Sequence, residues 1–237
     1  ILKKISDLIT SSIYVRKFKS HNKKLFIDNK LEESEDKKSL ILVDFNHFCF
    51  EHIGISYLLY CLRKKYNCKI KSYFSYTVVT YNLKRNIIQK LKFLTGRILK
   101  LKNFGIYNSF GVKDFYFPKP EKKHFFKAKK IYSKFIRTNN TRDKISNFKI
   151  DNILLGDLLY DSYLKKNYDI KPTIFVGDKK FLSFSYDFIL NSVIWIDMFK
   201  CNNIKAVIGS ASVYSVGVPL RIAIYKNIDA FVLNSEN

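Results

Sequence analysis

The order of short apolar runs and amphipathic segments constrains the fold of this chain more than any other feature of its sequence. The continuous apolar run Leu40–Phe45 is typical of a buried parallel strand. It is followed by a segment with helical spacing, His52–Tyr66, and then by an alternating, strand-like run, Lys69–Tyr76. Together the three segments have the length of one βαβ unit.

The same order returns near the end of the chain. Lys205–Ser210 and Asp229–Asn234 have strand patterns, and Val216–Lys226 between them has a helical one, with Pro219 near its start. Alternating strands and helices predict an α/β fold with an open, mostly parallel, Rossmann-like sheet that carries helices on both faces. Ligands of such sheets bind at the carboxyl ends of the strands, so the loops there are where functional residues are expected.

The middle of the chain has mainly helical patterns. Helices are expected over Leu83–Phe104, Lys122–Arg137, Thr141–Phe148 (capped by Thr141), Ile150–Lys165 and Phe181–Asn202. A short strand is expected at Phe110–Phe117, and Pro172–Val176 is interpreted as extended. Residues 1–39 are interpreted as an N-terminal amphipathic helix, Leu2–Phe18, followed by a linker, and residues 40–237 as one Rossmann-like domain.

The chain is strongly basic, with 43 Lys and Arg against 20 Asp and Glu and a formal charge of +23. Between His52 and Lys113 there are thirteen basic residues and no acidic one. Such a field attracts phosphate groups of nucleic acids, lipids or nucleotides, although codon bias is an alternative source of many lysines. The predicted helix Leu83–Phe104 places seven basic residues beside an apolar stripe. It suits an anionic membrane surface, but an ordinary core-facing helix has the same pattern.

Several classes of protein are disfavoured by what the sequence lacks. The four cysteines form no C-x-x-C pair, so zinc and disulfide frameworks are poorly supported and a reducing compartment fits. The sequence contains no apolar run of about 18 residues and no signal-peptide core. Neither G-x-G-x-x-G nor a P-loop motif occurs. These observations predict a cytoplasmic protein, peripheral on the inner face of the membrane if the basic helix binds lipid.

The first candidate site is the loop after the first strand. His47, Glu51 and His52 lie within six residues at a helix N-terminus, where unpaired N–H groups favour anions. His52 and Glu51 are candidate general bases for an acceptor hydroxyl, with His47 and Gly54 as candidate substrate-binding residues. Alternatively, Glu51 only caps the helix and the histidines are solvated. The pattern is not H-E-x-x-H, so no metal site is expected.

The second candidate site has a pair of carboxylates. Asp157 and Asp161 are four residues apart, hence on one helix face, and could orient sugar hydroxyls or share a proton. The alternative is that Asp157 caps its helix and Asp161 faces water.

The third candidate site follows a C-terminal strand. Ser210, Ser212 and Tyr214 lie where that strand gives way to a helix, and Arg221 on the helix could bind a carboxylate or phosphate through two N–H groups. A structural salt bridge from Arg221 is the alternative.

Four strings, taken in order, resemble bacterial surface-polysaccharide (capsule or O-antigen) biosynthesis proteins of the GT-B glycosyltransferase type. They are Leu40–Phe45, His52–Tyr60, Gly156–Leu164 and Val213–Ala223. The string Gly156-Asp-Leu-Leu-Tyr-Asp-Ser-Tyr-Leu164 is the most distinctive. The resemblance covers roughly residues 40–235 and corresponds to the N-terminal half of such an enzyme.

The resemblance implies two Rossmann-like domains facing across a cleft. The N-terminal domain binds the glycan or lipid-linked acceptor and supplies the base, which His52 or Glu51 matches by position. Ser210, Tyr214 and Arg221 match groups that line the cleft. The C-terminal domain would hold the nucleotide-sugar without a metal, and no other cofactor is implied. The first loop departs from the pattern because it is not rich in glycine and carries only Gly54.

The chain begins with Ile1 and ends at Asn237, and both ends are interpreted as cuts, so that the donor-binding domain is expected to be missing. The expected function is transfer of a sugar from a nucleotide-sugar to a surface-polysaccharide or lipid-linked acceptor. A polyol-phosphate polymerising transferase shares the two-domain plan. The alternatives from other classes are a basic nucleic-acid-binding protein, against which no recognition motif occurs, and a non-catalytic member of a polysaccharide assembly complex. The sequence does not indicate an oligomeric state.

Overall fold

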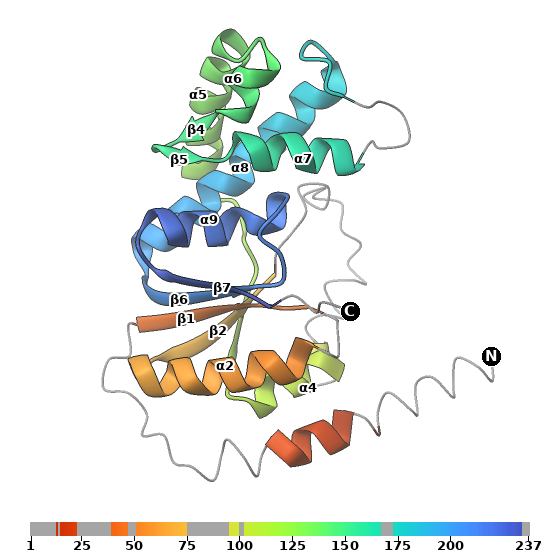
Figure 1. Ribbon diagram of the computed structural model, residues 1–237, viewed down its shortest axis with the longest axis vertical. Helices are drawn as coiled ribbons and strands as arrows, with labels where there is room; N and C mark the ends of the chain where they lie inside the picture. Colours follow the sequence, from red (N-terminus) through yellow and green to blue (C-terminus); the bar gives the residue numbers. More distant parts are fainter. Residues whose placement is uncertain are drawn as a thin grey trace, which may run out of the picture.

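The computed structural model describes residues 13, 15–22, 39–46, 51–74, 95–99, 102–166 and 173–233. Its centre is a five-stranded sheet in the order β3-β2-β1-β6-β7, and every pairing in it is parallel (Figure 1). The strands are β1 (Ser39–Asp44), β2 (Lys69–Tyr73), β3 (Asp114–Tyr116), β6 (Asn203–Gly209) and β7 (Asp229–Val232). The predicted open, parallel, Rossmann-like sheet is confirmed.

The strand order reverses between β1 and β6. The chain first adds strands on one side of β1, giving β2 and β3, and then crosses to the other side to add β6 and β7. β1 and β6 are therefore neighbours although more than a hundred residues separate them, and Val43 lies opposite Ile208 in their register. In doubly wound sheets, the carboxyl edge at such a reversal is where ligands bind.

Both faces of the sheet are covered, because the side chains of β1 are buried on both sides. Leu40 and Leu42 pack into one core, whereas Ile41 and Val43 pack into the other. The helices α2 (Glu51–Tyr66) and α4 (Lys102–Ser109) cover the second of these faces. The helices α8 (Lys179–Cys201) and α9 (Val218–Tyr225) cover the first, as Figure 1 shows.

A further layer of helices packs on α8 beyond the sheet. It consists of α5 (Lys122–Thr138), α6 (Arg142–Ser146) and α7 (Gly156–Lys166). α5 lies along α8, and α6 lies against α7 (Figure 1). The side chain of Thr141 caps α6 by accepting the N–H of Lys144, as the sequence predicts. No described helix is long and apolar enough to cross a bilayer.

One predicted helix is wrong at its start. Residues at the beginning of the predicted helix Ile150–Lys165 form an antiparallel hairpin of β4 (Lys149–Ile150) and β5 (Ile153–Leu154), and α7 begins only at Gly156. The loop residues Asp151 and Asn152 have φ of 50° and 65°. Two consecutive positive φ values are what a type I′ hairpin turn requires, and Asp and Asn tolerate them better than most residues.

Other predicted elements keep their type but differ in length. The predicted helix Val216–Lys226 is a 3₁₀ turn, Ser215–Gly217, followed by α9, and the predicted strand Phe110–Phe117 shortens to β3. Most of the predicted helices Leu2–Phe18 and Leu83–Phe104 lies outside the described residues. Of these regions, residues 15–22 and 95–98 are helical, and α4 continues to Ser109.

Candidate functional site

Asp44 and Ser210 meet at the point where the strand order reverses. Asp44 is the last residue of β1 and is 3% exposed, and Ser210 directly follows β6. The Ser210 hydroxyl donates a hydrogen bond to Oδ2 of Asp44. A buried carboxylate requires such partners, because burial without them costs several kcal/mol. This pair therefore ties together the carboxyl ends of two strands that are distant in the sequence.

The turn after β1 is held by side chains of α4. The Tyr107 hydroxyl donates to the backbone carbonyl of Asp44 at 2.6 Å and accepts the backbone N–H of Asn46 at 3.1 Å. Nδ2 of Asn103 donates to the carbonyl of Asn46 at 3.2 Å. Burial raises the pKa of Tyr107, which keeps its hydroxyl protonated and able to donate. α4 thus fixes the backbone on which the first candidate site is built.

Among the described residues, Glu51 is an accessible carboxyl at this edge. It occupies the first turn of α2, is partly exposed, and accepts a hydrogen bond from Nδ2 of Asn46 at Oε2. Partial burial raises the pKa of Glu51, the Asp44 carboxylate raises it further, and the hydrogen bond from Asn46 opposes both effects. A carboxylate with a raised pKa is a stronger base, so this side chain is suited to accept a proton from a hydroxyl.

His52 is buried rather than solvated. Its exposed fraction is 0%, and Nε2 lies 3.3 Å from the carbonyl oxygen of Asn46. Its ring packs edge-on against those of Tyr107 and Phe18, with centroid separations of 5.4 and 6.3 Å. In this position the imidazole supports the turn after β1, and its side chain has no exposed surface. His47, which the sequence also suggested for this site, lies outside the described residues.

Gly54 lies in the second turn of α2. A Cβ at this position would be in ordinary van der Waals contact, 3.8 Å, with Leu233, so the packing here does not require a glycine.

Asp157 and Arg221 bind one another. Nη1 of Arg221 donates to Oδ1 of Asp157 at 3.2 Å, and Nη2 donates to Oδ2 at 2.6 Å. Nη1 also donates to the backbone carbonyl of Leu154 at 3.1 Å. The pair joins α9 to the start of α7, which matches the structural alternative for Arg221; for Asp157 the alternative was a helix cap, and the structure shows a salt bridge instead. Asp161 lies one turn further along α7 and is exposed; partial burial, and then repulsion by Asp157, raise its pKa.

The remaining suggested residues lie in the loop before α9. Ser212 is exposed, and Tyr214 has a φ of 58°, an uncommon conformation for a residue other than glycine. Nζ of Lys165, in the last turn of α7, lies 4.0 Å from the centroid of the Tyr214 ring. Tyr214 therefore contacts α7.

The suggested residues accordingly form two groups. Glu51 and Ser210 gather with Asp44 at the carboxyl edge of β1 and β6. Asp157 and Arg221 form their ion pair between α7 and α9, on the face of the sheet that α9 covers. His52 is buried on the opposite face, which α2 covers. Reasoning from the sequence missed Asp44, Asn46, Asn103 and Tyr107. Asp44 carried a signal, since it is an acidic residue at the end of an otherwise apolar strand.

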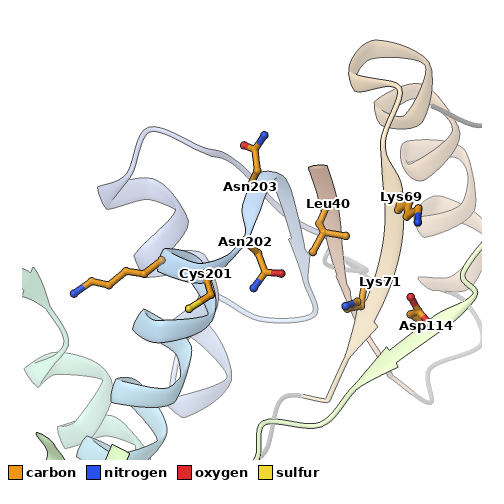
Figure 2. Close-up of a pocket in the computed structure, with 8 residues that line it drawn as sticks. Leu40, Lys69, Lys71, Asp114, Cys201, Asn202 and Asn203 are labelled. Atoms are coloured by element: carbon orange, nitrogen blue, oxygen red, sulfur yellow. The ribbon is translucent and has the colours of Figure 1, made fainter. Parts of the chain in front are cut away.

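A hollow of about 610 Å³ lies at the opposite, amino edge of the sheet. Figure 2 shows that its lining comes from the starts of β1, β2, β3 and β6 and from the end of α8. The residues that line it are Leu40, Lys69, Lys71, Asp114, Lys200, Cys201, Asn202 and Asn203. Lysines give this hollow a basic wall, but it shares no residue with the site at the carboxyl edge.

Within the described part of the chain, no group of three His, Cys, Asp or Glu side chains is placed to hold a metal ion. Comparison of the chain with protein-family models, with curated proteins and with solved structures gives no match.

Proposed function

We propose that this chain is the acceptor-binding domain of a GT-B-type glycosyltransferase that moves a sugar from a nucleotide-sugar to a surface-polysaccharide or lipid-linked acceptor. The observation that carries the proposal is Glu51, a partly exposed carboxyl with a raised pKa at the edge of a parallel sheet where the strand order reverses. Ligands of doubly wound sheets bind in the crevice at this point. The sugar-transferase class comes from the resemblance of the four strings described above.

In the proposed reaction, Glu51 acts as general base. Its carboxylate takes the proton of an acceptor hydroxyl while the hydroxyl oxygen bonds to the anomeric carbon of the donor sugar. The bond from that carbon to the nucleoside diphosphate breaks, and the diphosphate leaves with the electron pair. Asn46 holds Oε2 of Glu51, which leaves Oε1 for the acceptor. General-base assistance of this kind contributes about 10²- to 10⁴-fold to the rate.

The other residues of the edge position this base. Asp44 raises the pKa of Glu51 by repulsion, and Ser210 holds the Asp44 carboxyl through a hydrogen bond. His52 supports the turn through its contact with the carbonyl of Asn46. In this proposal a second Rossmann-like domain holds most of the nucleotide-sugar, and the protein works in the cytoplasm, where nucleotide-sugars are made.

The test uses the full-length protein that contains this chain, with a panel of radiolabelled nucleotide-sugars and with lipid-linked and polysaccharide acceptors from the cells that produce it. Glu51→Gln should lower kcat by about 100-fold or more and leave the affinity for the nucleotide-sugar, measured by calorimetry, unchanged. Asp143→Asn, in the exposed part of α6, is the matched loss of a carboxylate and should leave kcat unchanged.

Two results would reject the proposal. Undiminished transfer by Glu51→Gln would exclude Glu51 as the base, and absence of transfer from every donor in the panel would exclude the class. His52→Gln distinguishes a positioning role from a catalytic one: it should raise KM or lower stability while the pH profile of kcat keeps its acid limb. Glu51→Gln should lose that limb.

A further inference from the structure

The helix α5 carries a phenylalanine in the middle of its solvent-facing side. Phe126 is 76% exposed, whereas His124, Ala128 and Phe135 of the same helix are buried against α8 and its neighbours. At 3.6 residues per turn, Phe126 points almost directly away from this buried stripe. Its exposure is therefore a property of the helix orientation and not of a frayed end.

Basic residues surround Phe126. We call the exposed residues Lys122, Phe126, Lys129, Lys130 and Arg137 the α5 outer face. α5 itself contains no Asp or Glu. Within the part of the chain that the structure describes, the four cations of the outer face form no salt bridge.

Two acidic residues near α5 pair with lysines on one flank of the helix. Lys123 pairs with Asp197 of α8 at 2.8 Å, and Lys127 pairs with Asp151 of the β4–β5 loop at 2.8 Å. Both lysines lie on the same side of the buried stripe, so these contacts fasten the helix to the body of the protein along that side. The charges of the outer face are left without acidic partners among the described residues.

We propose that the α5 outer face docks the protein on an anionic lipid bilayer, with Phe126 inserted among the acyl chains and the surrounding Lys and Arg side chains among the headgroups. Such a surface offers negative charge above an apolar layer, which is the complement of a phenylalanine ringed by cations. Phe125 and Ile136, 38% and 46% exposed, add apolar area on one side of Phe126.

Other occupants fit this face less well. A second copy of the chain would bring a second set of cations against the first, because the outer face has no acidic residue to pair with them. A nucleic acid would satisfy the cations but leave Phe126 exposed or held against a phosphate backbone. This docking surface is a different segment from the helix Leu83–Phe104 that the sequence suggested for the membrane, and it does not depend on the proposed transferase function.

The test is co-sedimentation of the chain with vesicles of 30% phosphatidylglycerol in phosphatidylcholine, compared with phosphatidylcholine alone. The unaltered chain should bind only the anionic vesicles. Phe126→Ala should weaken this binding about tenfold, and Lys122→Glu/Lys129→Glu/Lys130→Glu should weaken it by about 100-fold or more. The matched controls are Ile224→Ala, at a 62% exposed position of α9, and Lys64→Glu/Lys179→Glu/Lys226→Glu, which gives the same net charge. Both controls should bind within about threefold of the unaltered chain.

Insertion of this position into the bilayer is measured separately, by the fluorescence of a Phe126→Trp variant. The native Trp195 is 1% exposed and the only tryptophan of the sequence, so a blue shift of emission on adding vesicles would report the substituted position. The proposal is overturned if the unaltered chain ignores anionic vesicles, if both α5 variants bind as well as their controls, or if the emission of the Phe126→Trp variant does not move. A Phe126-dependent dimer or tighter binding to duplex nucleic acid than to vesicles would assign the face to those partners instead.

Discussion

The Ser210 hydroxyl donates a hydrogen bond to the carboxylate of Asp44, and this contact spans the two strands between which the strand order reverses. Ser210 follows β6 and Asp44 ends β1, so the bond closes the carboxyl edge of the sheet where the proposed base lies. The Asp44 carboxylate is buried and has little access to water, so removing the Ser210 hydroxyl would leave one of its oxygens without this hydrogen bond.

Ser210→Ala should therefore lower the free energy of unfolding by about 1–2 kcal/mol. Urea unfolding followed by the fluorescence of Trp195 measures this change. Ser212→Ala removes a hydroxyl at an exposed position of the same loop and should change the free energy by less than about 0.5 kcal/mol. Equal effects of the two substitutions would contradict a special role for the bond to Asp44.

Glu51→Gln should make the protein more stable at neutral pH. The fold raises the pKa of Glu51 and so favours its protonated form. The stability that this residue contributes is complete below its ordinary pKa of 4.5 and is lost as pH rises through the raised pKa of the folded state. Glutamine mimics the protonated form and avoids this loss. The difference in unfolding free energy between variant and unaltered chain should thus grow from pH 4 to pH 7; a difference that shrinks over this range would show that the sign is wrong.

Arg221 and Asp157 should behave as a coupled pair. Arg221→Lys keeps the charge but loses the fork that makes two N–H contacts with the carboxylate, and should cost about 1 kcal/mol of stability. Asp157→Asn should cost a similar amount, and the double variant should cost less than the sum. Unfolding of all four proteins in urea gives the coupling free energy directly. Additive effects would mean that the two residues act independently.

Gly156→Ala should be among the most damaging single substitutions in the described chain. A Cβ at this position would lie 1.9 Å from the carbonyl oxygen of Ile145 and 2.6 Å from the amide nitrogen of Phe148, both backbone atoms. The α6–α7 contact would have to open, at a cost of about 3 kcal/mol or more. Gly177→Ala is the control, since nothing lies within 4 Å of its added methyl group. Thermal unfolding should separate the two variants clearly; similar Tm values would contradict the close contact at Gly156.

The alternation of apolar runs predicted the sheet correctly because strands buried on both faces leave a continuous apolar signature, as Leu40–Phe45 does. The hairpin at 149–154 was missed because its turn depends on two residues, Asp151 and Asn152, set within an otherwise helical pattern. An Asp-Asn pair between two isoleucines was the available signal.

The candidate site was predicted only in part. Glu51 and Ser210 were chosen because they follow strands, and the structure brings them to the same edge. Neighbours such as Tyr107, supplied from a helix some sixty residues away, depend on tertiary packing that no local pattern encodes. The exposure of Phe126 carried a signal in the sequence that was not used, because the other apolar residues of α5 share one side of the helix and Phe126 lies on the opposite side.

Burial of the middle of α8 limits the ways in which this protein can unfold locally. Every residue from Phe188 to Ile196 is buried, since α5, α7 and α9 surround the helix on the sides that the sheet leaves uncovered. Backbone amides in this stretch cannot be reached by solvent unless both the helical layer and the sheet separate from it. Deuterium uptake there should consequently be the slowest in the molecule and should occur only through global unfolding, so the layers on either side of α8 form a single cooperative unit.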